Sequence, residues 1–405
     1  MPGFEMFGLP PSIDQLRAQA AAGPVVSFIV SVHCSAALVP TAHNVTAVTL
    51  PGLTPDALNE QINAFHTALN DVHGAQGGRA ANKVLTETLA WLWDQAAAPV
   101  VHQLGYRSAP AADGRPWPRV WWVTGGQLGL LPLHAAGHHD DPPSPERRSV
   151  ADRVVSSHTP TVRALGHARR ARPAPAMAAT SSLIVAMPTT PDLPAALQGA
   201  PLHHVPDEAR RLAAILPHPL TLTGPVPAML ARPEDLAGAP PAEAPTRRRV
   251  LAELPNHAIT HFACHGTSDP EDPSKSRLLL NDHRDQPLTV SSLAPINLDR
   301  AQLAYLSACN TAANTAGALL DEAIHLAGAF QLAGFPHVIG TLWPIDDEFA
   351  VDVATGFYTA LRDDDGAMDT DRASIALHLT LRTLIREQDL NATPWLWAPY
   401  IHAGA

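Results

Sequence analysis

Two reactive side chains each follow an apolar run in this sequence. His265 comes directly after residues 259–264 (ITHFAC), and Cys309 comes directly after residues 303–308 (LAYLSA). A thiol attacks as its thiolate, and an imidazole held beside it can remove or share the thiol proton. The pair therefore predicts thiol chemistry, with Cys309 as the candidate nucleophile and His265 as its partner.

The elements around the pair indicate how the two residues could meet. From residue 182 onward, predicted strands and helices alternate, which is typical of a mainly parallel sheet flanked by helices. The expected strands are 182–188, 258–264, 303–308 and 337–342, and the expected helices are 206–216, 319–333 and 348–361. Ligands bind beyond the carboxyl ends of the strands in such sheets, so residues 44 positions apart in sequence can meet there.

The neighbours of His265 have different expected roles. Residues two apart along a strand share a face, so His261 is expected on the face of His265 and Cys264 on the opposite one. We expect Cys264 to be a small buried hydrophobe and His261 to be packed behind the site. Gly266 lets the backbone approach a substrate closely. The backbone N–H groups of Gly266 and Cys309 are candidate oxyanion donors.

Metal binding is the competing interpretation of these side chains. His261, Cys264, His265 and Cys309 are all acceptable zinc ligands, but Cys264 is expected on the wrong face and closely paired cysteines are missing. Residues 138–141 (HHDD) also resemble ligands, and we prefer a solvated turn there. We therefore predict no metal and no other cofactor.

The first 180 residues follow another order of elements. Runs at 25–30 and 45–48 predict a hairpin, Thr54 and Pro55 predict a helix start, and residues 82–97 show helical periodicity. A further strand is expected at residues 120–123, before a linker rich in Ala, Pro and Arg at 169–180.

The linker divides the chain into parts. We expect a helical N-terminal extension over residues 1–23, an α+β half over 24–175, and an α/β half over 176–405 that carries both reactive residues. The Pro- and Ala-rich stretch 224–246 is expected to be an exposed loop.

Composition excludes several classes of protein. With 27 Lys and Arg against 38 Asp and Glu, the net charge is −11, which disfavours nucleic acid as the main partner. The three cysteines are too few and too far apart for a disulfide framework, so a reducing cytoplasmic setting is expected. No apolar run approaches the length of a membrane helix, and no secretion signal is evident.

Seven stretches of the sequence carry recognisable motifs: 118–123 (PRVWWV), 131–137 (LPLHAAG), 261–266 (HFACHG), 306–312 (LSACNTA), 321–327 (DEAIHLA), 334–343 (GFPHVIGTLW) and 397–402 (WAPYIH). Together they resemble the CHAT family of caspase-like cysteine peptidases, relatives of separase. The similarity spans nearly everything from Gly23 onward. A histidine roughly fifty residues or fewer before the cysteine is also the order found in caspase-type peptidases.

This resemblance implies a fold and an activity. The fold would be a caspase-like sheet with a non-catalytic, pseudo-caspase-like N-terminal half. His265 would be the general base, and Cys309 the nucleophile, of an endopeptidase that makes limited cuts in a protein, in bacterial defence or programmed death. The family commonly carries helical repeats before the peptidase, and no 34-residue repeat is evident here. A separate activator or adaptor protein is therefore expected.

Substrate specificity is harder to derive. By resemblance, the first subsite would involve Ser307 and the loop that contains Trp343, Asp346 and Asp347, and the acidic pair could receive a basic substrate residue. Alternatively, Asp346 or Asp347 merely caps the following helix. Two other functions remain open: a catalytically silent scaffold that binds partners, and another enzyme with a cysteine nucleophile, such as an acyltransferase or amidase.

Overall fold

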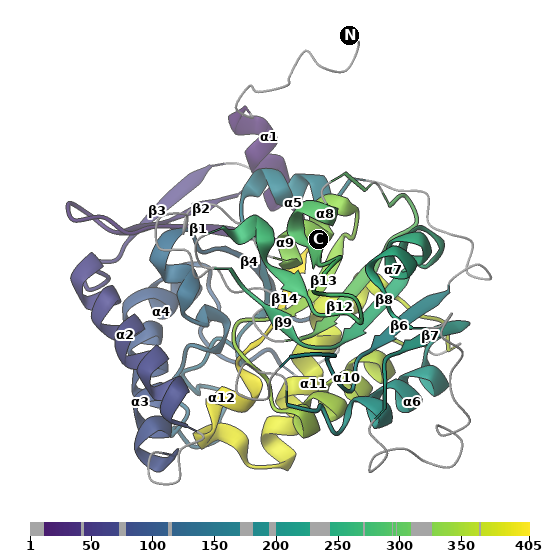
Figure 1. Ribbon diagram of the computed structural model, residues 1–405. Coiled ribbons are helices and arrows are strands. Elements are labelled where there is room, and N and C mark those ends of the chain that lie inside the picture. Colours follow the sequence, from purple (N-terminus) through teal and green to yellow (C-terminus); the bar gives the residue numbers. More distant parts are fainter. Residues whose placement is uncertain are drawn as a thin grey trace.

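Figure 1 shows the computed structural model of the chain. The structure describes residues 12–41, 44–72, 78–111, 116–170, 181–193, 200–226, 244–269, 272–293, 295–296, 298–308, 326–363 and 366–405. Cys309 and the linker residues 171–180 lie outside the described residues, as do 227–243 of the expected loop and 319–325 of an expected helix.

One sheet of eleven strands organises the described part of the chain, in the order β3-β2-β1-β4-β5-β14-β13-β12-β8-β6-β7. Its strands are β1 (Val25–Ile29), β2 (Ala36–Pro40), β3 (Val45–Thr49), β4 (Arg119–Val123), β5 (Val155–His158), β6 (Ser182–Ala186), β7 (Pro219–Thr223), β8 (Ile259–Ala263), β12 (Leu303–Ser307), β13 (His337–Thr341) and β14 (Tyr400–Gly404). A small antiparallel sheet follows β8 and contains β9 (Gly266–Thr267), β10 (Arg277–Leu278) and β11 (Leu288–Thr289).

The predicted parallel sheet is confirmed. Strands β7, β6, β8, β12 and β13 run parallel, so their carboxyl ends lie at one edge of the sheet. Every residue of β6, β8, β12 and β13 is buried, as expected for strands covered by helices on both faces.

The C-terminal strand β14 joins the two ends of the sheet. It pairs antiparallel with β13 on one side and parallel with β5 on the other. Strands β1, β4 and β5 therefore run opposite to the block that contains β8 and β12.

Helices cover both faces of the sheet (Figure 1). They are α1 (Ile13–Ala18), α2 (Pro55–Asp71), α3 (Gly78–Leu92), α4 (Ala98–Gln103), α5 (Val162–Ala168), α6 (Val205–Ile215), α7 (Arg247–Glu253), α8 (Val290–Leu293), α9 (Leu326–Ala333), α10 (Asp347–Ala360), α11 (Ala373–Glu387) and α12 (Pro394–Trp397). Residues of α6, α10 and α11 share one apolar core with alternate residues of β8 and β12, whereas α7, α8 and α9 pack in the core on the opposite face.

The N-terminal elements differ from the predicted hairpin. The two predicted runs form β1 and β3, but they do not pair with each other, because β2 lies between them and pairs antiparallel with both. The hairpin prediction is therefore wrong in its connectivity. The helix start is confirmed: the Thr54 side chain accepts the Ala57 N–H, and Pro55 opens α2.

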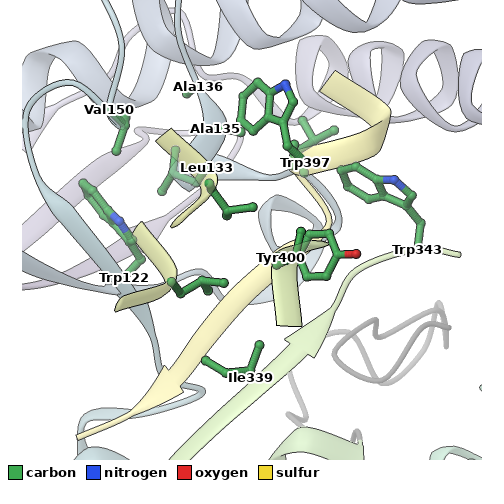
Figure 2. Packing of buried hydrophobic residues seen from close by; sticks show 14 of the residues in the cluster. Trp122, Leu133, Ala135, Ala136, Val150, Ile339, Trp343, Trp397 and Tyr400 are labelled. Atoms are coloured by element: carbon green, nitrogen blue, oxygen red, sulfur yellow. The ribbon is translucent and has the colours of Figure 1, made fainter. Parts of the chain in front are cut away.

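Aromatic side chains fill the core where the early and late parts of the chain meet. Figure 2 shows Trp343, Trp397 and Tyr400 grouped above Ile339 of β13, with Trp122 of β4 further along the cluster. The Trp343 ring also packs edge-on against Phe65 of α2 at 5.5 Å between ring centroids. The loop after β13 therefore rests on a helix from the first part of the chain.

Candidate active site

His265 lies just beyond the carboxyl end of β8, between β8 and β9. Its side chain is only 6 % exposed, and its Nε2 lies 2.9 Å from the backbone carbonyl oxygen of Ala200. A carbonyl oxygen can only accept a hydrogen bond, so Nε2 must carry the proton. Nδ1 is then the basic nitrogen of the neutral ring, and the Ala200 carbonyl selects this tautomer.

The adjacent strand β12 brings the chain leading to Cys309 to the same edge. Ser307, its last residue, pairs with Ala263 of β8 in the parallel register, and the Ser307 carbonyl accepts the Cys264 N–H at 3.3 Å. The next carbonyl, of Ala308, accepts the Thr341 hydroxyl from β13 at 2.6 Å. The backbone directly before Cys309 is therefore held from both neighbouring strands.

The expected alternation along β8 is confirmed. Cys264 is 2 % exposed and packs in the core beneath α7, α8 and α9, on the face opposite His261. It is a buried thiol packed among apolar side chains, which is typical of a structural cysteine. His261 is fully buried on the other face.

His261 belongs to a buried polar cluster behind the site. Its Nε2 lies 3.1 Å from Oε1 of Glu208 on α6, and its Nδ1 lies 3.3 Å from the hydroxyl of Tyr358 on α10. The Tyr305 ring stacks on the imidazole with 4.9 Å between centroids. Burial, followed by the nearby charge of Glu208, raises the pKa of the Tyr305 hydroxyl well above 10, so this phenol stays neutral.

Two candidate subsite residues have protein partners of their own, and a third is buried. Trp343 is 6 % exposed and donates its indole N–H to the Trp395 carbonyl at 3.0 Å. The Asp346 carboxylate caps α10 by accepting the Phe349 N–H at 2.9 Å. Ser307 is buried at the end of β12.

Asp347 is half-buried and accepts the backbone N–H of His204 through Oδ2 at 2.8 Å. Burial raises the pKa of its carboxyl group; the hydrogen bond and the charge of His204 lower it, and the nearby charges of Glu208 and Asp346 raise it. No Lys or Arg among the described residues forms an ion pair with it. Asp347 is therefore a half-buried carboxylate with no ion-pair partner among the described Lys and Arg residues.

Removing the cap at Asp346 is expected to destabilise α10. The substitution Asp346→Ala should lower the free energy of unfolding by about 1 kcal/mol, because the Phe349 N–H loses its acceptor. Urea denaturation measures the change. Asp346→Asn is the matched control, since an asparagine side chain can still cap the helix; an equal loss in both variants would contradict the capping role.

The second set of possible metal ligands forms ordinary protein contacts. His138 Nε2 lies 3.0 Å from an Asp94 carboxylate oxygen. Asp141 forms a bidentate ion pair with Arg148. His139 is 7 % exposed and bonds through Nε2 to the Ala135 carbonyl at 2.8 Å, so the predicted solvated turn is wrong at this residue. Across the described ranges, no three His, Cys, Asp or Glu side chains are grouped as a metal site would require.

Burial of His139 predicts an acid-sensitive fold. Desolvation lowers the pKa of His139 from 6.5 to about 4, so the unfolded chain binds the proton first as the pH falls. The free energy of unfolding should therefore decrease between pH 6.5 and pH 4, by at most about 3 kcal/mol from this residue.

Urea denaturation at several pH values tests this contribution. The His139→Gln variant should show a shallower loss of stability on acidification than the wild-type chain, whereas His33→Gln, at an exposed histidine, should follow the wild type. Identical pH dependence in all three proteins would contradict the assignment to His139.

Two cavities lie away from His265, where residues 134–158 meet α11. One of about 50 Å³ is lined by His134, His158, His378 and His402, and the other, of about 420 Å³, lies between the 139–152 loop and α11. His265 lines neither cavity. The strand-edge geometry, rather than cavity size, therefore defines the candidate active site.

Comparison with solved structures finds proteins of similar fold. Saccharomyces cerevisiae separase, solved in complex with securin, superposes with a TM-score of 0.58 at 10% identity and covers 96% of this chain. This chain spans only 30% of the separase chain. The Arg-specific cysteine proteinase gingipain R matches with a TM-score of 0.45 at 10% identity, over 77% of this chain and 68% of its own.

The sequence also identifies the family. The CHAT domain model matches residues 86–405, so the chain belongs to the CHAT family. No curated protein sequence matches it. Among the helices of the described ranges, none is both long and apolar enough to cross a membrane.

Sequence reasoning missed the groups that hold the histidines in place. A backbone carbonyl such as that of Ala200 has no side-chain signature. Glu208 could have been suspected, because it falls on the apolar face of α6 beside the buried Val205, Ala209 and Leu212.

Proposed function

We propose that this chain is a cysteine endopeptidase that makes limited cuts in a partner protein, with His265 as general base and Cys309 as nucleophile. The observation that carries the proposal is the pairing of Ser307 with Ala263 in adjacent parallel strands. Each candidate residue follows its paired strand residue by two positions in the sequence. Neighbouring strands are about 4.8 Å apart, a spacing suited to proton transfer between side chains at their ends.

The proposed reaction begins with proton transfer from the Cys309 thiol to Nδ1 of His265. The thiolate attacks the carbonyl carbon of the scissile peptide bond, and the backbone N–H groups of Gly266 and Cys309 stabilise the oxyanion. His265 then gives the proton to the leaving amine as the carbon–nitrogen bond breaks. Water, deprotonated by His265, hydrolyses the thioester and releases the second product.

A basic residue before the cut is part of the proposal. Asp347 supports this better than Asp346, because the Asp346 carboxylate is occupied as a helix cap. A substrate Arg or Lys would form the ion pair that no described Lys or Arg forms with Asp347. A preference for an apolar residue at that position in cleavage kinetics would contradict it.

The assignment of different functions to the two halves of the chain is also a proposal. Residues 176–405 would form the catalytic half, and residues 24–175 a non-catalytic half on which a separate activator or adaptor acts. The contact of Trp343 with Phe65 supports communication between the halves. Cytoplasmic defence or programmed death is the proposed setting.

A survey of new protein N-termini in a cell lysate tests the activity. The lysate is treated with the wild-type chain, either active or alkylated beforehand with iodoacetamide, and new N-termini are identified by mass spectrometry. Cuts made only by the unmodified chain support a thiol endopeptidase, and the residues before the cuts define the first subsite. No cuts in either sample, with a candidate activator also supplied, would favour a silent scaffold. Acyl transfer without chain cleavage would favour a transferase.

A further inference from the structure

One short segment of chain contacts three functional parts of the candidate site. Within residues 200–208, the Ala200 carbonyl binds His265, the His204 N–H binds Asp347, and the Glu208 carboxylate binds His261. The three contacts come at four-residue intervals. The segment therefore connects the candidate base, the proposed specificity loop and the strand that carries the base.

The segment has features that make it stiff. Proline follows Ala200 directly, and Pro206 lies in the first turn of α6, so the φ angle is fixed at two positions. Leu202 donates its N–H to the Pro188 carbonyl at 2.8 Å, which attaches the segment to the chain leaving β6. Because these features limit bending within the segment, we expect a displacement at Glu208 to be transmitted toward Ala200.

Glu208 is the anchor of this segment. Its side chain is 1 % exposed and His261 is fully buried, so their 3.1 Å contact forms without competition from water. Removing the carboxylate would leave one imidazole nitrogen buried without its partner, which is the costly way to break a buried contact. His261 lies on β8, four residues before His265. The Glu208 contact thus fixes α6 to the strand that ends at the candidate base.

We propose that Glu208 is a positioning residue: through His261 it holds α6 against β8 and so keeps the Ala200 carbonyl on Nε2 of His265. The inference rests on the proposed role of His265 as the base for Cys309. Without Glu208, the Ala200 carbonyl no longer selects the tautomer whose Nδ1 is basic. The Cys309 thiol then loses its proton acceptor and behaves as an ordinary thiol.

The pH profile of Cys309 alkylation by iodoacetamide tests the proposal. Peptide mass spectrometry separates the modification of Cys309 from that of Cys34 and Cys264. In Glu208→Ala we expect alkylation at pH 7 to slow about tenfold and the midpoint of its pH profile to rise by about one unit, toward the ordinary thiol value near 8.5. A folded Glu208→Ala protein with the wild-type profile would overturn the proposal.

Two matched variants separate positioning from general loss of structure. Glu208→Gln keeps an oxygen that can accept the His261 N–H, so it should restore alkylation to within about twofold of the wild type. Asp207→Ala removes the neighbouring carboxylate, which pairs with Arg210 and Arg211 at the surface, and should also leave the profile unchanged. A shifted profile in Asp207→Ala equal to that of Glu208→Ala would count against a specific role for Glu208.

Nuclear magnetic resonance of the wild-type chain keeps the proposal testable if Glu208→Ala does not fold. Long-range ¹H–¹⁵N correlation, with the His265 signal assigned from its loss in His265→Gln, should show the Nε2–H tautomer. The Nδ1–H tautomer would overturn the proposal. Neither measurement needs a substrate, so a shifted alkylation profile without any cleavage would support the positioning role while the endopeptidase proposal fails.

Discussion

Replacing Cys309 with Ala is expected to lower the rate of substrate cleavage by at least about 10⁴-fold, because the variant has no sulfur with which to form the thioester. The substrate is a peptide that spans a cut found in the N-terminal survey, and the rate is measured by separating its products. The fold should be retained, since alanine adds no atoms at the site. The change in thermal unfolding should therefore be small.

The other two cysteines provide the controls. Cys34 is exposed, and Cys264 is buried in the core. Cys34→Ala should cleave at the wild-type rate, and Cys264→Ala should lose stability without losing the nucleophile. More than trace cleavage by Cys309→Ala, or its loss in Cys34→Ala, would assign the chemistry to another group.

The parallel block of the sheet could be predicted from sequence because its strands are buried on both faces. Strands β8 and β12 are mainly apolar and buried throughout, and the side-chain alternation around Cys264 follows from strand geometry alone. The cap at Asp346 was one of two open interpretations, and the structure places it on the Phe349 N–H. Local patterns of this kind require no knowledge of distant contacts.

The rest depends on contacts between distant parts of the chain. Strand β2 was missed because its residues 36–40 include two alanines and a proline, which weakens the strand signal. The insertion of β14 between β13 and β5 has no local signature, because pairing partners are set by the whole fold. Similarly, Glu208 and His261 are 53 positions apart, and only tertiary packing shows that the carboxylate is buried against the imidazole.

Replacing His265 with Ala is expected to reduce kcat/KM at pH 7 by about 10²–10⁴-fold, the usual contribution of a positioned general base. Part of the activity should return above about pH 8.5, where the thiol ionises without a base. The pH profile of peptide cleavage between pH 6 and 10 measures both effects.

His283 is a matched control: it is also 6 % exposed, and its Nε2 lies 2.9 Å from the Pro191 carbonyl. His283→Ala should leave the pH profile unchanged. A His265→Ala profile parallel to that of the wild type would show that the imidazole does not take the thiol proton, because only the loss of a base changes the shape of the profile.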